Sequence, residues 1–410
     1  MKDFFKVMDI DQVTALATGF GTVAEETVPA DETLDRILAE AVVSDIDLPD
    51  FRRTTMDGYA VRAGATFGAS EGSPAYLNVK GTIRMGDVPD FSVGPGEAAR
   101  ISTGGMLPDA ADAVVMIEHT EALDDTVIEV YKSVAPGQHV VDVGEDFQRG
   151  ETVLERGRRI RPQEMGVLSA LGRESVRVFR RPVVGIISTG DEVVPIDRMP
   201  RQGQIRDVNT YSLAGWVRRA GAVPKTYGII PDRRDDLREA CRRALSESDM
   251  VLVSGGSSVG TRDYTIDVLE SLPQSRVLVH GISISPGKPT ILASVDDKPF
   301  WGLPGHVVSA MVVFAVVVRP FIDHMAGLAA SGMPDLRIPA RLTRNLASAQ
   351  GRVDYVRVRL TATAEGGLGA EPILGKSGLI HTMVRADGLI RIDRDVEGME
   401  KGTAVQVLPL

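Results

Sequence analysis

Apolar runs of strand length alternate with segments of helical periodicity between residues 182 and 330. The strand candidates are PVVGIIS, PKTYGII, DMVLVSG and RVLVHGISI, and the helix candidates are NTYSLAGWVRRAGA, DRRDDLREACRRALSES, YTIDVLESL and GHVVSAMVVFAVVVRPFI. Nearly continuous apolar strands that alternate with helices are typical of a parallel sheet covered on both faces. We therefore predict an α/β sheet domain in this part of the chain.

The flanking segments follow other patterns. Residues 31–44 carry Leu34, Ile37, Leu38 and Ala41 at helical spacing behind Asp31, a suitable cap, which predicts a helix. Glycine and proline recur every few residues from 47 to about 145, between short β-type runs, which predicts a small β unit. Short strands return after residue 330, as in DYVRVRLTAT, which predicts a terminal β-barrel or sandwich.

Length and composition limit the possible architectures and partners. A chain of 410 residues exceeds what one core supports, so several domains are expected. The net charge of −10 argues against nonspecific nucleic-acid binding but allows an anionic small molecule. The apolar run 307–322 is short for a membrane helix and contains Arg319, so we predict a buried helix, no membrane contact and a cytoplasmic location. The single cysteine, Cys241, is interpreted as a packing residue.

Two glycine-containing polar loops follow apolar strands, and they carry the first functional prediction. The loop STGDE holds Ser188, Thr189, Gly190, Asp191 and Glu192, and the loop SGGSSVGTRD holds Gly255, Gly256, Ser257, Ser258 and Asp263. Adjacent parallel strands would bring both loops to the same sheet edge, where open α/β sheets bind ligands. Paired glycines and serines suit a phosphate, whereas the alternative interpretations are a capped turn and a flexible loop.

Three further segments complete this predicted site. ISPGKP places Lys288 in a stiff turn, GLPGH places Pro304 and Gly305 before the long apolar helix, and Asp232 follows a strand. We interpret all five pieces as strand-to-helix turns of one sheet. Asp232 is also a candidate helix cap, and His306 is interpreted as a cap rather than a ligand. Carboxylates such as Glu192, Asp232 and Asp263 suit Mg²⁺ better than zinc.

The set of motifs as a whole resembles the molybdopterin molybdenumtransferase family, that is, the MoeA and gephyrin E-domain family. The resemblance covers nearly the whole chain and rests on TMDGYA, STGG…P…ADAVVM, GED, STGDE, D.N, SGG.SVG..D, PGKP, GLPG..VSA and GR..Y.RV. Read alone, TMDGYA and STGG are β-turns. The resemblance implies an enzyme of molybdenum cofactor biosynthesis that inserts molybdate into adenylylated molybdopterin, with a divalent cation, and releases AMP.

The resemblance also implies domains, assembly and residue roles. It implies an elongated helical linker domain (1–46 plus 147–178), a small β domain (47–146), an α/β molybdopterin-binding domain (179–330) and a C-terminal β-barrel (331–410). It further implies a homodimer with a shared active site. The residues it assigns to the chemistry are Asp57, Thr103, Glu192, Asp232 and Asp263, of which the last three hold the metal. Those it assigns to substrate binding, beside the two loops, are Asp146, Pro286, Gly287, Lys288, Pro304, Gly305, Ser309, Arg352 and Ser377.

The chain departs from the family pattern where the oxyanion is expected. Ser285 and Gly281 occupy positions that are usually lysine, and His306-Val307 replaces the usual Asn-Pro. The usual basic run before GED is replaced in this chain by the residues of VVDVGED, with Val141. Losing one charge-assisted hydrogen bond weakens anion binding by roughly tenfold or more. One alternative is therefore a paralogue that carries molybdopterin without inserting metal. Another, which rests only on a sheet domain that the two families share, is a nucleotide amidohydrolase.

Overall fold

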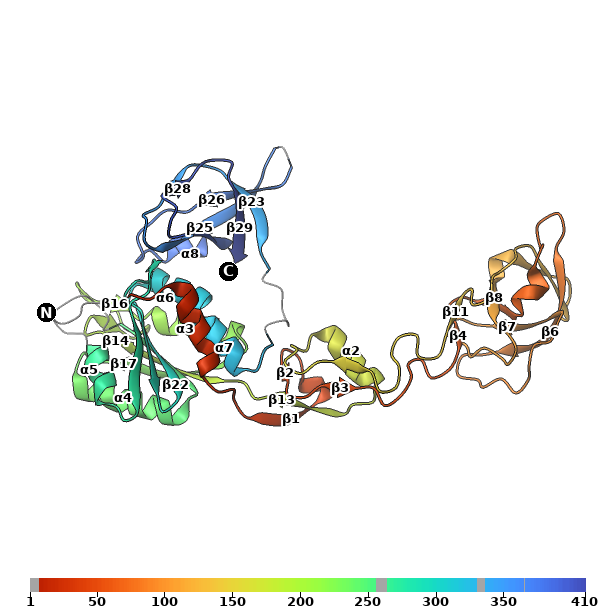
Figure 1. The fold of residues 1–410 in the computed structure, drawn as a ribbon, viewed down its shortest axis with the longest axis horizontal. Helices are drawn as coiled ribbons and strands as arrows, with labels where there is room; N and C mark the ends of the chain where they lie inside the picture. The colour runs from red at the N-terminus through yellow and green to blue at the C-terminus, as the bar shows by residue number, and fades with distance from the viewer. Residues whose placement is uncertain (1–6, 256–263, 330–335, 365) are drawn as a thin grey trace. The chain divides into compact units, whose positions relative to one another are not determined.

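The computed structural model describes residues 7–255, 264–329, 336–364 and 366–410. The chain divides into two compact units, which are drawn together in Figure 1. Unit 1 comprises residues 1–40, 156–166 and 173–410, and unit 2 comprises residues 41–155 and 167–172. The division into four domains with the boundaries given above stays a prediction.

A six-stranded sheet forms the centre of the α/β part of unit 1. Its order is β17 (Val223–Ile230), β14 (Val183–Thr189), β18 (Met250–Ser254), β22 (Lys298–Leu303), β21 (Ile291–Val295) and β19 (Ser275–His280). The first four strands are parallel, as predicted, but β21 and β19 are antiparallel to their neighbours. A two-residue turn, Asp296 and Asp297 with φ of 51° and 57°, joins β21 to β22 as a hairpin.

Helices cover both faces of this sheet. On one face lie α3 (Asn209–Arg219) and a long helix formed by α6 (Val307–Val313), η5 (Phe314–Val318) and α7 (Arg319–Met325). On the other lie α4 (Arg234–Glu247) and α5 (Tyr264–Ser271). Cys241 packs in the core under α4, where burial raises the pKa of its thiol to about 12, which supports its interpretation as a packing residue.

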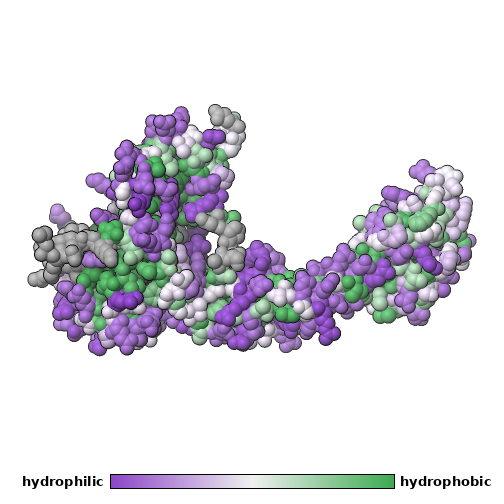
Figure 2. All heavy atoms as spheres, in the orientation of Figure 1, coloured by the Kyte–Doolittle hydropathy of each residue, from purple (hydrophilic) through white to green (hydrophobic). Residues whose placement is uncertain are grey.

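By length and composition alone, the helix from Val307 to Met325 could cross a membrane. It is, however, mostly buried within the protein. Trp301 of β22 packs edge-on against Phe321 with ring centroids 4.9 Å apart. Figure 2 shows hydrophilic residues over much of the visible surface of each unit. The helix is therefore part of the protein core, as predicted.

The predicted helix over residues 31–44 is wrong. This segment contains η2 (Ala30–Glu32), β2 (Ile37–Leu38) and β3 (Val42–Val43), and Leu34 is exposed. Asp35 has a φ of 61°, which interrupts any helix. Because Ile37 and Leu38 pair with β13 (Ser175–Phe179) beside β1 (Glu25–Pro29), tertiary contacts override the helical periodicity. The helices nearest to the N-terminus are α1 (Ile10–Ala15) and η1 (Leu16–Gly19).

Glu164, in the first turn of α2 (Pro162–Ala170), is a buried carboxylate that pairs with two half-exposed arginines in unit 1. Its Oε1 accepts hydrogen bonds from Arg161 Nη2 at 2.6 Å and Arg158 Nη2 at 2.7 Å. These bonds, that of Arg161 first, lower the pKa of the Glu164 carboxyl to about 2. The carboxylate thus stabilises the fold at pH values above the ordinary glutamate pKa. This contribution is lost as the pH falls toward 2.

We expect Glu164→Gln to lower the free energy of unfolding at pH 7 by about 2–3 kcal/mol. The variant should also lose less stability than the wild type between about pH 4.5 and pH 2. Denaturant melts across this pH range check both statements. Equal pH dependence in the two proteins would contradict the structural account of these ion pairs.

Unit 2 is built on a six-stranded sheet, as the glycine- and proline-rich pattern predicts. Its order is β8 (Ala113–Met116), β5 (Gly58–Val61), β7 (Glu97–Ile101), β6 (Ala75–Ile83), β10 (Val127–Val130) and β9 (Thr120–Ala122). Unit 2 also contains two short antiparallel pairs. In one, β4 (Arg53–Thr54) pairs with β11 (Val140–Val141), and in the other, β3 pairs with β12 (Thr152–Leu154). A Cβ on Gly58 would lie 1.9 Å from the Val115 carbonyl oxygen, so this glycine of the TMDGYA motif is required by packing.

The C-terminal part of unit 1 is a closed barrel. Its strands are β25 (Val353–Ala362), β26 (Leu368–Pro372), β23 (Ile338–Leu342), β29 (Ala404–Pro409) and β27 (Gly388–Ile392), and β27 pairs back with β25. A short strand from the middle of the chain, β20 (Ile284–Ser285), runs parallel to β25. This pairing places the segment before Pro286 on the barrel rather than on the α/β sheet. Smaller elements are β15 (Val193–Val194), β16 (Ile205–Arg206), β24 (Leu346–Ala347), β28 (Gly398–Met399) and α8 (His381–Val384).

Candidate functional site

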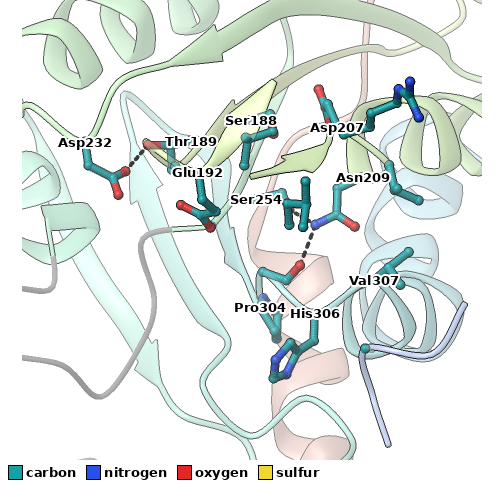
Figure 3. A pocket seen from close by; sticks show the side chains of 18 of the residues that line it. Ser188, Thr189, Glu192, Asp207, Asn209, Asp232, Ser254, Pro304, His306 and Val307 are labelled. Carbon is teal, nitrogen blue, oxygen red and sulfur yellow. Dashed lines mark hydrogen bonds between the residues drawn. The ribbon is translucent and has the colours of Figure 1, made fainter. Parts of the chain in front are cut away.

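A cavity of about 1560 Å³ lies at the carboxyl ends of β14, β18 and β22. Strands β14 and β18 are adjacent and parallel, with Ser188 opposite Ser254, so the strand ends that precede the two loops share one edge, as predicted. The segment Pro304–His306, after β22, forms another wall. Figure 3 shows Thr189, Glu192 and Asp232 grouped together in this cavity.

Three carboxylates line the cavity, those of Glu192, Asp207 and Asp232. Asp232 Oδ1 accepts a hydrogen bond of 2.6 Å from Thr189 Oγ1, and the Asp232 N–H donates to Asp191 Oδ1 at 3.1 Å. The first residue of α4 is Arg234, and Arg233 precedes it without a side-chain cap, so Asp232 is not the helix cap. Asp191 therefore orients Asp232, whose carboxylate is held at the cavity by Thr189.

Glycines permit the close approach of the two loops. A Cβ on Gly255 would lie 2.3 Å from the Thr189 carbonyl oxygen, and its φ is +108°. A Cβ on Gly190 would lie 2.8 Å from Glu192 Oε2. Of the predicted phosphate loop, Gly256, Ser257, Ser258 and Asp263 lie outside the described residues. Among the residues that the structure describes, no three acidic, histidine or cysteine side chains form a metal-binding group.

Asn209 is a site residue to which the sequence reasoning gave no role. Its Nδ2 donates to Ser254 Oγ at 2.6 Å and to the Gly305 carbonyl at 2.8 Å, so one amide joins two walls of the cavity (Figure 3). Asp207 Oδ1 accepts from the Thr210 N–H at 3.0 Å and thereby fixes the start of α3. Asn209 belongs to the D.N motif, but its role depends on contacts with loops that are far away in the sequence.

A second cavity of about 460 Å³ shares Pro289, Pro304 and His306 with the first. Its polar lining comprises Ser285, Lys288, Ser309, Arg352, Asp354, Arg357 and Ser377. The expectation that PGKP is a strand-to-helix turn of the α/β sheet is wrong, because the turn connects β20 to β21 and β20 pairs with the barrel. Pro286, Gly287 and Lys288 nonetheless lie at the edge of this cavity.

The cations of the second cavity differ in their partners. Arg352 Nε donates to Asp354 Oδ1 at 2.9 Å. Among the described residues, no hydrogen bond or ion pair involves the Lys288 ammonium. Arg357 is buried, and its guanidinium donates to Thr382 Oγ1 at 2.7 Å and to the Gly375 carbonyl at 2.9 Å. Burial lowers the pKa of Arg357, and its Nε has no partner in the described part of the chain.

His306 occupies the position before the first residue of α6, but its imidazole does not cap the helix. The prediction that His306 is a cap residue is confirmed for its position, because its carbonyl accepts from the Ala310 N–H at 3.0 Å, although its imidazole makes no capping bond. Nδ1 of His306 forms a hydrogen bond of 3.0 Å with Ser377 Oγ. The carbonyl of Ser377, and not a side chain, accepts from the Val308 N–H at 3.0 Å. The Val308 N–H at this helix end is thus not free to bind a ligand.

Asp57 and Thr103 lie together in unit 2. Asp57 Oδ1 accepts from the Thr103 N–H at 2.6 Å and from Thr103 Oγ1 at 3.0 Å. The bond from the backbone, followed by that from the hydroxyl, holds the pKa of Asp57 below its ordinary value. The carboxylate is therefore ionised and exposed at neutral pH. Asp146 is also exposed in unit 2, and its N–H donates to the Leu48 carbonyl at 3.0 Å.

Known proteins resemble this chain over nearly all of its length. Family models match it in three consecutive segments: "MoeA N-terminal region (domain I and II)" over residues 8–172, "Probable molybdopterin binding domain" over 185–324 and "MoeA C-terminal region (domain IV)" over 339–410. The molybdopterin molybdenumtransferase of Bacillus subtilis is 34% identical over 93% of this chain and 89% of its own length. That of Haemophilus influenzae is 32% identical, over 92% of each chain.

Solved structures agree with this relationship. A molybdopterin biosynthesis MoeA protein from Pyrococcus horikoshii OT3 matches 99% of this chain and 100% of its own, with 30% identity and a TM-score of 0.85. Another crystal structure of a MoeA protein from Pyrococcus horikoshii is 37% identical, with a TM-score of 0.79 over 98% of this chain and 99% of its own. The chain therefore belongs to the MoeA family of molybdenum cofactor biosynthesis, and the predicted multidomain fold is confirmed.

Proposed function

We propose that this protein is a molybdopterin molybdenumtransferase that binds adenylylated molybdopterin and molybdate, releases AMP and inserts molybdenum into the pterin dithiolene. The observation that carries this proposal is the pair of cavities with a common wall at Pro289, Pro304 and His306. The larger cavity is lined by three carboxylates, loop hydroxyls and one cation, Arg206, whereas the smaller one is lined by three cations, serine hydroxyls and one carboxylate, Asp354. The first suits a nucleotide with a metal and the second an oxyanion.

The residues of the larger cavity fit a hard divalent cation. Glu192 and Asp232 offer two carboxylates, and Mg²⁺ is commonly held by one or two carboxylates plus substrate phosphates. When bound, Mg²⁺ neutralises charge on the phosphoryl oxygens. The chain's own groups orient the substrate: Thr189 fixes Asp232, and Asn209 fixes Ser254 beside the phosphate loop. In the proposed step, water attacks one phosphorus of the pyrophosphate, the P–O–P bond breaks, and AMP leaves.

The smaller cavity suits molybdate. Lys288 supplies a cation that no described side chain neutralises, and Arg357 adds a buried charge that has no carboxylate partner among the described residues. Ser309 and Ser377 add hydroxyl groups. These donors line the same cavity as Ser285, which stands where the family usually has a lysine. Their presence supports the proposal that this chain still binds an oxyanion.

The assembly, location and metal belong to the same proposal. The resemblance supports a homodimer in which Asp57 and Thr103 of one subunit complete the site of the other. It also supports a cytoplasmic enzyme that uses Mg²⁺, with Asp263 as the third metal ligand.

The experiment is to incubate purified protein with adenylylated molybdopterin and molybdate and to follow AMP by chromatography. We expect AMP release with Mg²⁺, its loss on chelation with EDTA, and its return when Mg²⁺ is added back. Tight binding of the pterin without AMP release in any of these conditions would instead support the carrier function.

A further inference from the structure

His306 lies in the wall between the two cavities and contacts a residue of the oxyanion pocket. It lines both cavities, and its Nδ1 is 3.0 Å from Ser377 Oγ. Although its backbone caps α6, its imidazole makes no cap bond, so helix capping does not account for the placement of the side chain. This contact joins the α/β domain to a segment of the C-terminal barrel domain.

The direction of this hydrogen bond decides what Ser377 offers to an anion. A serine hydroxyl has one hydrogen and two lone pairs, whereas each imidazole nitrogen either donates or accepts. If Ser377 donates to Nδ1, its oxygen presents only lone pairs to the cavity, which repel an oxyanion. If Nδ1 carries the hydrogen and donates to Ser377, the hydroxyl hydrogen is free to point into the cavity.

We propose that His306 is a positioning residue for the oxyanion: its Nδ1–H donates to Ser377 Oγ, so that the Ser377 hydroxyl donates to bound molybdate. This inference rests on the proposed function and adds a residue to it. It also assigns a role to the histidine at the position where the chain departs from its family. The Ser377 hydroxyl adds a hydrogen-bond donor to those of Lys288 and Ser309. In the same pocket Ser285 provides a hydroxyl group and no charge.

The backbone around Ser377 is held independently of this side-chain pair. The Ser377 carbonyl accepts from the Val308 N–H at 3.0 Å, and Arg357 holds the Gly375 carbonyl at 2.9 Å. Substitutions of the His306 and Ser377 side chains therefore leave these two bonds in place. They change the polarity of the pocket and preserve the path of the segment.

The test is calorimetric titration of molybdate into the wild type and five variants. His306→Leu removes the donor, and His306→Asn keeps an N–H near the position of Nδ1. Ser377→Ala removes the hydroxyl, alone and together with His306→Leu. Lys288→Met tests the pocket itself. Thermal melts of each variant report on folding, and His306→Ala replaces His306→Leu if the latter does not fold.

We expect His306→Leu and Ser377→Ala each to weaken molybdate binding about tenfold. The double variant should be no weaker than Ser377→Ala alone, because His306 acts on the anion only through the Ser377 hydroxyl. His306→Asn should stay within about threefold of the wild type. Wild-type affinity in His306→Leu, or multiplied losses in the double variant, would overturn this inference while Lys288→Met still weakens binding. Unchanged binding in Lys288→Met would instead overturn the proposed oxyanion pocket, and the inference with it.

Discussion

Replacing Glu192 by Gln or Asp232 by Asn is expected to slow AMP release from adenylylated molybdopterin by about 100- to 1000-fold. Each change keeps the shape of the side chain and removes one negative charge from the larger cavity. A carboxamide binds Mg²⁺ more weakly than a carboxylate does, so the developing phosphoryl charge is less well neutralised. Single-turnover measurements of AMP at saturating substrate isolate this effect from substrate affinity.

The matched control for these variants is Glu239→Gln. Glu239 is an exposed residue of α4 in the same domain and lines neither cavity. This variant should release AMP at the wild-type rate. Rates within threefold of the wild type in both Glu192→Gln and Asp232→Asn would show that these carboxylates do not hold the catalytic cation.

Replacing Gly287 by Ala is expected to lower the free energy of unfolding by about 3 kcal/mol. Gly287 has a φ of +124°, and a Cβ there would lie 2.3 Å from Val313 Cγ2 of α6. Because the turn that carries Lys288 packs directly on this helix, the added methyl group must displace either the turn or the helix. Molybdate affinity should therefore fall together with stability.

Chemical denaturation and molybdate titration check the Gly287 prediction. Gly215→Ala is the control, because Gly215 lies inside α3 with nothing within 4 Å of the added Cβ. This helical glycine should gain about 0.5–1 kcal/mol of stability on substitution. If Gly287→Ala were as stable as the wild type and bound molybdate equally well, the close packing of the PGKP turn on α6 would be contradicted.

The larger cavity was predictable because its residues directly follow apolar strands. Ser188 and Ser254 lie at the carboxyl ends of two strands whose apolar pattern is complete in the sequence, and parallel pairing alone brings them to one edge. Asn209 was not assigned because its partners, Ser254 and Gly305, are 45 and 96 residues away along the chain. Local patterns identify a strand end but do not identify which distant loops it meets.

The smaller cavity depends on contacts that periodicity does not encode. The pairing of β20 with β25 moves the PGKP turn from the predicted sheet edge to the barrel, and the bond between His306 and Ser377 joins residues 71 positions apart. The local pattern of the strand around Arg357 does not show that its buried guanidinium fixes the Gly375 carbonyl. The helix predicted near Leu34 was wrong for a similar reason, because pairing with β13 outweighed a short periodic run.

The most direct test of the proposed function is the ratio of molybdenum retained to AMP released. Purified protein is given adenylylated molybdopterin, Mg²⁺ and molybdate, and the metal bound to the pterin is measured by elemental analysis after excess molybdate is removed. We predict one molybdenum atom incorporated for each AMP released, with no incorporation in Asp232→Asn. Pterin that stays bound with neither AMP nor incorporated molybdenum would contradict the transferase assignment and identify a carrier.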